Sequence, residues 1–428
     1  MNINKKIAVI GLGYVGLPLA IEFSKYFFTI GYDKDKNRLK NLNDGYDATG
    51  EVGQKDLTNT KLKFAESKKE IANCDIYIIT VPTPVDKFNV PDMSALNSAT
   101  ELVASVLQKG NLVIYESTVY PGATEEFCVP ILEEKSGLVY NKSFSCGYSP
   151  ERINPGDKKH KLTSIKKVTS GSNTKSAKLV DDLYKKIIPA GTHLASSIPI
   201  AEAAKVIENI QRDVNIALIN ELSIIFNKMN LDTKEILDAA STKWNFIPFK
   251  PGLVGGHCIG VDPYYLTFKA ASIGYHPEMI LAGRRINEGV SKFIAENTIN
   301  EMVKKTINPM NSRVGMLGIT FKEDCPDLRN TKVPDIIKFL KSYGCEIIVS
   351  DYFADPNEAK RYYNIELSDI SEMQNLDAII VTVSHASYLK MKKLEWEKML
   401  KSNGVVIDVK SIFSRGFFAD TNISHWRM

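Results

Sequence analysis

The stretch KIAVIGLGYVGLPLAIEFSKYFFTIGYD, from Lys6 to Asp33, indicates the fold. Its first residues, KIAVI, form a short β-rich run that ends in a glycine turn. The residues LPLAIEFSKYF then show helical spacing, and FTIGYD forms a second strand that ends at Asp33. A strand, a glycine turn, a helix and a second strand open a parallel βαβ unit, because parallel strands need a crossover connection.

The glycines of the turn, Gly11, Gly13 and Gly16, have the spacing GxGxxG. The motif gains weight from the strand before it, the helix after it and an acid about 20 residues later. The first glycine permits a tight turn, the second lets a pyrophosphate approach the backbone, and the third lets the helix pack on the strand. The pyrophosphate would meet the free N–H groups of the helix N-terminus. Asp33 can accept hydrogen bonds from the adenosine ribose, which favours NAD over NADP, although a nearby arginine, Arg38, can tolerate a 2′-phosphate.

Further buried strands are expected at 75–81 (DIYIITV) and 111–118 (NLVIYEST), because their apolar character is nearly continuous. Thr83 follows the first of these strands and Thr118 ends the second, at the edge where ligands bind in parallel sheets. Both threonines are therefore candidates for contact with the cofactor, with ordinary loop threonines as the alternative.

From Pro199 to Asn230 the chain changes to helical spacing without an internal glycine or a further proline. This segment predicts one long helix or two stacked ones, and a subunit interface. After Pro309 the strands return, and DAIIVTVSHA resembles the earlier DIYIITVPTP. We therefore predict an α/β protein with two doubly wound Rossmann-like domains joined by a central, mainly helical domain with a long helix. The expected domains are residues 1–195, 196–300 and 301–428.

A single cysteine, Cys258, lies in the glycine-rich segment KPGLVGGHCIGVDPYYL. A nucleophilic thiol needs a nearby cation or backbone dipoles. On the long helix, Lys205, Asn209 and Arg212 share one face, which could hold a negatively charged oxygen. The alternatives are a solvated helix face and a buried small cysteine. A thiol beside a nicotinamide suits the four-electron oxidation of an alcohol to an acid through a thiohemiacetal and a thioester.

Composition excludes several classes of protein. The net charge of +4 is too small to indicate nucleic-acid binding. No segment approaches the ~18 apolar residues of a membrane span, and no signal peptide is recognisable, so a cytoplasmic protein is expected. The six cysteines are scattered singly, and His257 directly precedes Cys258, which argues against disulfides and a zinc site. No metal is predicted.

At this point the sequence resembles the nucleotide-sugar 6-dehydrogenases, which include the UDP-glucose and GDP-mannose dehydrogenases. The resemblance covers nearly the whole chain and lies in motifs that follow the order of the family: GLGYVGLPLA, VPTP, EST, SPER, EAAKVIEN, GGHCIGVDPYYL and GITFKEDCPDLRNT. The GGHC sequence is most similar to the branch that acts on UDP-N-acetylhexosamines in capsule and O-antigen pathways, since UDP-glucose enzymes typically carry GGSC.

The resemblance implies NAD as cofactor and a UDP-sugar as substrate. The expected reaction oxidises C6 of UDP-N-acetylglucosamine or UDP-N-acetylgalactosamine to the uronic acid for surface polysaccharide synthesis. Alternatives are a UDP-glucose or UDP-N-acetylmannosamine 6-dehydrogenase, a two-electron β-hydroxyacid dehydrogenase and a non-catalytic NAD-binding regulator. The three domains would bind NAD, carry the catalytic residues and the dimer interface, and bind the UDP-sugar. A homodimer or higher oligomer is implied.

The family also implies roles for individual residues. Cys258 would be the nucleophile, with Lys205 and Asn209 stabilising the oxyanion, Asp262 handling water and protons, and Glu151 and Thr118 assisting hydrolysis. The residues expected to line NAD are Gly11, Gly13, Tyr14, Val15, Gly16, Asp33, Arg38, Thr83, Thr118 and Arg329. The residues expected to contact the UDP-sugar are Arg152, Lys205, Asn209, Arg212, Lys243, Asn245, Gly252, Phe321, Lys322 and Arg285, the last from the neighbouring subunit.

Overall fold

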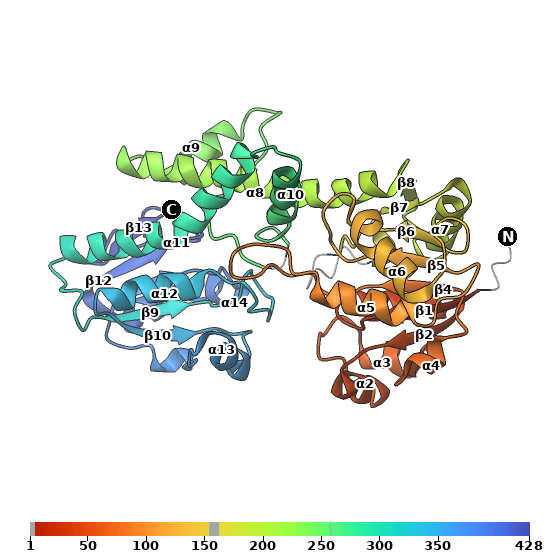
Figure 1. Ribbon diagram of the computed structural model, residues 1–428. Coiled ribbons are helices and arrows are strands. Elements are labelled where there is room, and N and C mark those ends of the chain that lie inside the picture. Colours follow the sequence, from red (N-terminus) through yellow and green to blue (C-terminus); the bar gives the residue numbers. More distant parts are fainter. Residues whose placement is uncertain (1–4, 154–161, 257) are drawn as a thin grey trace. The chain divides into compact units, whose positions relative to one another are not determined.

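The computed structural model describes residues 5–153, 162–256 and 258–428. The chain divides into two compact units (Figure 1). The first unit comprises Met1–Glu208 and Tyr264–His276, and the second comprises Asn209–Pro263 and Pro277–Met428. The predicted division into three domains, with boundaries near residues 195 and 300, stays a prediction.

The first unit contains an eight-stranded sheet with the order β3-β2-β1-β4-β5-β6-β7-β8. All neighbouring strands are parallel except β6 and β7, which are antiparallel. The strand order reverses between β1 and β4, and ligands of doubly wound sheets bind at such a switch point. The strands are β1 (Lys6–Ile10), β2 (Phe28–Tyr32), β3 (Lys63–Ala65), β4 (Ile76–Ile79), β5 (Leu112–Tyr115), β6 (Ser145–Tyr148), β7 (Lys167–Gly171) and β8 (Thr192–Leu194).

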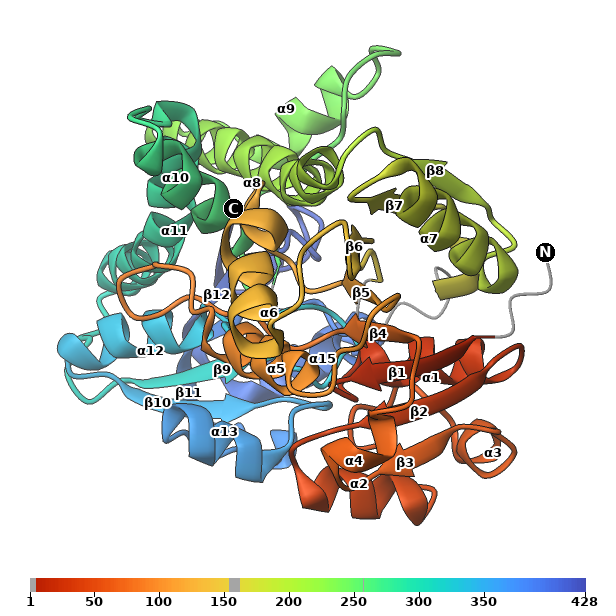
Figure 2. The same cartoon turned by 45° about the vertical axis from the view of Figure 1, so that its right-hand side comes forward.

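Helices cover both faces of this sheet, and each face has its own buried cluster (Figure 2). Successive residues of a strand point to opposite faces, so Ala8 and Ile10 join one cluster whereas Ile7 and Val9 join the other. One cluster packs under α5 (Ser94–Ala104) and α6 (Val129–Ser136), and the other packs under α1 (Gly16–Ser24), α2 (Lys36–Asn43) and α7 (Thr174–Ile187). Shorter helices are α3 (Gln54–Thr58) and α4 (Lys68–Ile71), with the π-turn η1 (Thr124–Cys128) and the 3₁₀ turn η2 (Leu162–Ser164).

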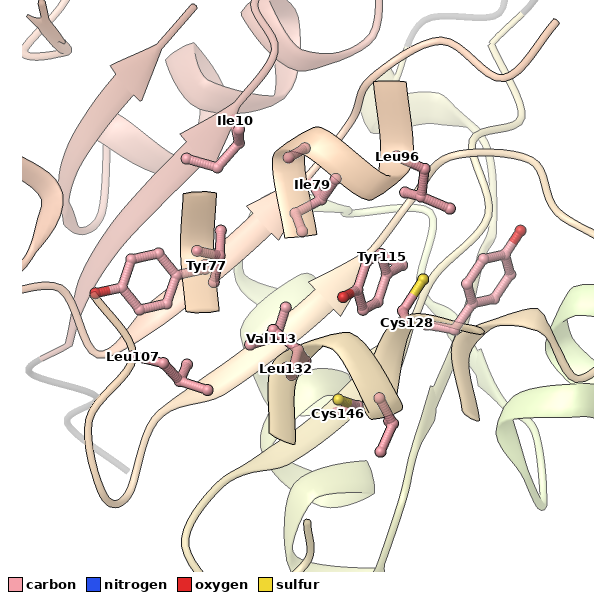
Figure 3. Close-up of a cluster of buried hydrophobic side chains, with 14 of the residues drawn as sticks. Ile10, Tyr77, Ile79, Leu96, Leu107, Val113, Tyr115, Cys128, Leu132 and Cys146 are labelled. Carbon is pink, nitrogen blue, oxygen red and sulfur yellow. The ribbon is translucent and has the colours of Figure 1, made fainter. Parts of the chain in front are cut away.

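The cluster under α5 and α6 includes buried tyrosines. Figure 3 shows Tyr77, Val113 and Tyr115 of the strands gathered with Leu96 of α5 and Leu132 of α6. The tyrosine hydroxyls within it are satisfied, because Tyr77 Oη donates to the Ile71 carbonyl oxygen at 3.1 Å and Tyr115 Oη lies 3.2 Å from Thr100 Oγ1. A tightly packed core of this kind holds the carboxyl ends of β4 and β5 in fixed positions.

The second unit contains a five-stranded parallel sheet with the order β10-β9-β11-β12-β13. In chain order this is 2-1-3-4-5, the other common doubly wound arrangement, with its switch point between β9 and β11. Helices α11 and α12 belong to one buried cluster of this sheet, and α14 and α15 belong to the other. The strands are β9 (Arg313–Leu317), β10 (Glu346–Ser350), β11 (Leu376–Val381), β12 (Leu400–Asp408) and β13 (Ser424–Arg427). The helices are α9 (Thr233–Ala240), α11 (Glu278–Lys304), α12 (Val333–Ser342), α13 (Pro356–Tyr363), α14 (Ala386–Leu389) and α15 (Lys393–Met399), with the 3₁₀ turn η3 (Ile370–Glu372).

Two helices cross the division between the units, α8 (Ile198–Lys228) and α10 (Asp262–Ser272). The segment from Pro199 to Asn230 was expected to form one helix or two, and α8 is a single helix of 31 residues. Its only proline is in the first turn, where a backbone N–H would have no hydrogen-bond partner within the helix.

The predicted fold class, with two parallel sheets and a mainly helical region between them in the sequence, is confirmed. Among the described residues, no helix is both long and apolar enough to cross a bilayer.

Candidate functional site

The glycine turn after β1 lies at the switch point of the first sheet. Gly11 has φ +94°, a conformation that L side chains rarely adopt, and its N–H donates to the Tyr32 carbonyl oxygen at 2.8 Å. A Cβ at Gly16 would lie 1.8 Å from the Gly11 carbonyl oxygen, so only glycine lets α1 begin there. A Cβ at Gly13 would meet nothing within 4 Å. The turn therefore presents open space beside Gly13, the glycine at which the motif predicts the approach of a pyrophosphate, and Tyr14 and Val15 lead from it into α1.

Asp33 and Arg38 are both tied to this turn. Asp33 Oδ2 accepts a hydrogen bond from the Leu12 N–H at 2.8 Å, and Arg38 Nε donates to the Leu12 carbonyl oxygen at 2.9 Å. The guanidinium of Arg38 also lies 2.7 Å from Asp47 Oδ1, and the Asp47 carboxylate is fully buried. Burial would raise the pKa of Asp47, but hydrogen bonds from Thr49 and Arg38 outweigh burial and lower it. Because Asp47 balances the charge of Arg38, that arginine is a poor receptor for a 2′-phosphate, and the site fits NAD.

Thr83 and Thr118 come together at the carboxyl ends of β4 and β5. Thr83 Oγ1 donates to the Thr118 carbonyl oxygen at 2.6 Å. The hydroxyl of Tyr265, from α10, donates to the Thr83 carbonyl oxygen at 2.8 Å. These contacts lie within the first unit and fix the two threonines at the edge of the sheet that holds the glycine turn.

Glu151 and Arg152 follow β6 at the same edge. Glu151 Oε1 accepts hydrogen bonds from the backbone N–H groups of Arg152 and Ile153, so the carboxylate folds back on its own turn. Arg152 Nη2 lies 2.7 Å from Glu208 Oε1 on α8, and Arg152 Nη1 donates to the Lys166 carbonyl oxygen. Lys205, also on α8, is 6% exposed, which rules out the alternative that this residue belongs to a solvated face.

In the second unit, hydrogen bonds connect the predicted nucleophile segment to α8. Asp262 N–H donates to the Cys258 carbonyl oxygen at 2.8 Å, which closes a turn from the cysteine to the aspartate. Asp262 Oδ2 accepts from Asn209 Nδ2 at 2.6 Å, and Arg212 Nη1 lies 3.4 Å from Asn209 Oδ1. Both Asn209 and Asp262 are buried, whereas Cys258 is half-buried. The amide of Asn209 has a second N–H that can serve an oxyanion while Asp262 holds the first.

A pocket lies at the carboxyl ends of β9, β11 and β12, at the switch point of the second sheet. The predicted substrate residues Phe321 and Lys322 line it. Sequence reasoning missed Glu323 and Lys410, which also line it and pair with each other at 2.9 Å. Burial would raise the pKa of Glu323, but Lys410, a backbone hydrogen bond and Ser384 together outweigh burial and lower it to about 2. The sequence could have indicated Lys410 as a candidate, because it comes at the end of a predicted strand and so lies at the ligand-binding edge of the sheet.

The loop that bears Cys258 contacts this pocket. Gly255 is among its lining residues, and a Cβ at Gly256 would lie 2.9 Å from the ring of Phe321. The backbone of Gly252 is held from both sides by the amide of Asn220, which accepts from the Gly252 N–H at 2.8 Å and donates to the Gly252 carbonyl oxygen at 3.0 Å. These contacts bring the predicted residues Gly252 and Phe321 to one side of the second unit.

Other predicted residues are not among those lining the pocket. Lys243, Asn245 and Arg285 are exposed. The neighbour of Arg285, Arg284, is buried and lies 2.7 Å from Asp213. Arg329 donates from Nε and Nη2 to the two carboxylate oxygens of Asp327, at 2.9 and 2.7 Å. His257 lies outside the described residues. In the described part of the chain, no three His, Cys, Asp or Glu residues are grouped to hold a metal ion.

The turn after β9 repeats the turn after β1. Gly318 also has φ +94°, and its N–H donates to Ser350, just as Gly11 donates to Tyr32. Asp351 stands where Asp33 stands in the first unit, and accepts from the Ile319 N–H at 2.6 Å. However, Asp351 is also bonded by His385 and by the Phe353 and Ala354 N–H groups, and its side chain is fully buried. Both oxygens of Asp33 also accept backbone N–H bonds, from Leu12 and Asp35, but Asp33 is partly exposed. The Asp351 side chain has no exposed surface and is covered by His385, so it is not open to a ribose.

A glycine turn at the switch point, an acid at the end of the second strand and a doubly wound sheet are the features of a dinucleotide-binding domain. The family models of the UDP-glucose/GDP-mannose dehydrogenase family match the chain in order. The NAD binding domain matches residues 5–188, the central domain 200–289 and the UDP binding domain 315–415. The chain belongs to the UDP-glucose/GDP-mannose dehydrogenase family.

Individual relatives are similar over nearly the whole chain. The UDP-N-acetyl-D-glucosamine 6-dehydrogenase of Pseudomonas aeruginosa is 53% identical and covers 95% of this chain and 96% of its own. Protein CapL of Staphylococcus aureus is 52% identical and covers 99% of this chain and 100% of its own. Among solved structures, the UDP-D-ManNAc dehydrogenase of Pyrococcus horikoshii superposes with a TM-score of 0.88 at 29% identity, covering 98% of each chain.

Proposed function

We propose that this protein is an NAD-dependent UDP-N-acetyl-D-glucosamine 6-dehydrogenase that converts the C6 hydroxymethyl group of its substrate to a carboxylate. The observation that carries the proposal is the arrangement of Cys258, Asp262 and Asn209, which the reaction needs and which a two-electron dehydrogenase would not. The substrate follows from the relatives of that name at 53% and 52% identity.

Bound NAD accepts a hydride in each of the two oxidations. The sulfur of Cys258 adds to the aldehyde carbon that the first oxidation leaves, and the carbonyl oxygen becomes an oxyanion. Lys205 and Asn209 stabilise that oxyanion with an ammonium group and an amide N–H. Asp262 holds the amide of Asn209 at 2.6 Å and so fixes its orientation. The second oxidation gives a thioester, and water releases the acid with help from Asp262, Glu151 and Thr118.

The pocket of the second unit suits the nucleotide part of the substrate. Lys322 supplies positive charge for a diphosphate, Lys410 keeps further N–H donors beside its partner Glu323, and Phe321 supplies an aromatic face for a base or sugar. Arg152 and Arg212 would add charge, and Lys243 and Asn245 would complete the uridine or sugar subsite. Arg329 would reach the cofactor. The pocket faces the ligand-binding edge of its sheet, as a UDP-binding domain requires.

We also propose that the protein is a homodimer in the cytoplasm, that Arg285 reaches the neighbouring site, and that the product serves surface polysaccharide synthesis. In support of the dimer, Leu218 and Ile225 on α8 and Met229 beyond it are 52%, 44% and 58% exposed, at helical spacing. Light scattering on the wild type and on Leu218→Asp tests the dimer. We expect a dimer that the aspartate weakens, and a monomeric wild type would refute it.

The test of the reaction is an NADH-release assay across UDP-N-acetylglucosamine, UDP-N-acetylgalactosamine, UDP-N-acetylmannosamine and UDP-glucose. We expect the highest kcat/KM with UDP-N-acetylglucosamine and two NADH for each sugar consumed. One NADH per sugar would indicate the two-electron alternative. A preference for UDP-N-acetylmannosamine would assign the chain to the activity named for its structural neighbour from Pyrococcus horikoshii.

A further inference from the structure

A buried charge cluster lies behind Glu151 in the first unit. Lys167, the first residue of β7, is 2% exposed and places Nζ 2.5 Å from Glu116 Oε2 and 3.7 Å from Glu151 Oε2. Glu116, directly after β5, is 1% exposed and also accepts a hydrogen bond from the hydroxyl of Tyr184 on α7. The ammonium group of Lys167 lies 5.5 Å from the centre of the Tyr184 ring.

The antiparallel pairing of β7 explains why these groups meet. β6 and β7 pair with Tyr148 opposite Ser170, so the chain that leaves β6 toward Glu151 runs beside the start of β7. A parallel strand at this position would have placed its first residue at the far edge of the sheet. The reversed strand instead brings Lys167 to the carboxyl edge, where Glu116 and Glu151 both lie.

The cluster holds two carboxyl groups and one ammonium group with almost no exposure to water. Burial raises the pKa of Glu116, and Lys167 opposes only part of this effect. Burial raises the pKa of Tyr184 as well, so its hydroxyl stays a donor to Glu116. Glu151 Oε2 is buried and accepts no hydrogen bond from any residue that the structure describes. Oε2 of Glu151 therefore remains to accept a hydrogen bond, with the ammonium group of Lys167 and the carboxyl group of Glu116 beside it.

We propose that Lys167 and Glu116 are positioning residues that set the protonation of Glu151 in the hydrolysis of the thioester. The inference rests on the proposed function. In that step a water oxygen bonds to the thioester carbon, Glu151 takes the proton of the water, and the carbon–sulfur bond breaks with its electron pair returning to the sulfur of Cys258. Lys167, Glu116 and Tyr184 are described titratable groups that lie around Glu151, and the Arg152 guanidinium pairs with Glu208.

Two substitutions should move the pH dependence of hydrolysis in opposite directions. Lys167→Met removes the positive charge near Glu151, which should shift the acid limb of the rate profile to higher pH by about one unit. Glu116→Gln removes the other carboxyl group and leaves Glu151 as the carboxylate partner of Lys167. The acid limb of the rate profile should therefore shift to lower pH. A merely structural cluster would lower the rate at every pH without opposite shifts.

The measurement is a single-turnover quench with NAD and UDP-N-acetylglucosamine, in which NADH formation and acid release are followed separately from pH 5 to 9. Lys185→Met, a surface change next to Tyr184 on α7, controls for the loss of a lysine and should leave both rates unchanged. If Lys167→Met does not fold, Glu116→Gln decides the question alone. An acid limb that stays in place or moves to higher pH in Glu116→Gln would overturn the inference. One NADH per sugar in the wild type would instead overturn the proposed function.

Discussion

Two substitutions in the glycine turn should affect different properties: one should lower the stability of the fold, and the other should weaken NAD binding. We compare Gly13→Ala with Gly16→Ala, two changes that add one methyl group three residues apart in the same turn. At Gly16 the methyl carbon would lie 1.8 Å from the Gly11 carbonyl oxygen and 2.4 Å from Thr80 Oγ1. Neither atom lies at the end of a long flexible side chain, so α1 must move away from β1. Overpacking of this kind costs about 1–3 kcal/mol or more of folding free energy.

At Gly13 the same methyl group meets no protein atom within 4 Å, and the residue does not require a positive φ. The free energy of unfolding without ligand should therefore change by no more than about 0.5 kcal/mol. The methyl group occupies the space through which a pyrophosphate approaches the backbone. NAD affinity should fall at least tenfold, which corresponds to about 1.4 kcal/mol.

The assays are urea unfolding of the ligand-free proteins and calorimetric titration with NAD. We expect Gly13→Ala to unfold as the wild type does and to bind NAD weakly, and we expect Gly16→Ala to be destabilised. Wild-type NAD affinity in Gly13→Ala would refute the placement of the pyrophosphate at this turn. An unchanged stability of Gly16→Ala would refute the packing argument.

Three further predictions concern single side chains. Lys410→Met should raise KM for the UDP-sugar about tenfold with little change in kcat, whereas Lys401→Met, a control in the strand β12 that precedes Lys410, should change neither in steady-state assays. Lys205→Ala should lower kcat about a hundredfold by removing charge from the oxyanion site, and an unchanged kcat would exclude that role. Asp351→Asn should cost about 2 kcal/mol of unfolding free energy at neutral pH, because the pKa of Asp351 is about 2 in the folded protein and near 3.8 when unfolded. That difference from the wild type should shrink as pH falls from about 4 to 2 in denaturant titrations, and a constant difference would contradict it.

Much of the fold was predictable because its signals are local. The run KIAVI became β1 with the predicted bounds, since it is apolar and ends at a glycine that the turn requires. The segment after Pro199 became a single helix because nothing within it interrupts the hydrogen-bond ladder. The resemblance of DIYIITVPTP to DAIIVTVSHA reappears in β4 and β11, each of which pairs with the first strand of its sheet.

The parts that sequence reasoning missed depend on partners far apart in the chain. Nothing near Lys167 indicates that β7 reverses direction and carries this lysine to Glu116. Likewise, Lys410 pairs with Glu323 only because β12 ends beside the loop after β9. Local periodicity can predict strands and helices. It does not indicate how strands far apart in the sequence pair, and that pairing brings the two buried charges together.

The central claim is that the sulfur of Cys258 bonds to C6 of the sugar during oxidation. The direct test is intact-protein and peptide mass spectrometry after rapid acid quench of the protein with NAD and UDP-N-acetylglucosamine. We predict a covalent acyl adduct on the peptide that contains Cys258, and neither adduct nor acid in Cys258→Ser. Full acid production by Cys258→Ser, or an adduct-free wild type that still forms two NADH per sugar, would contradict the claim.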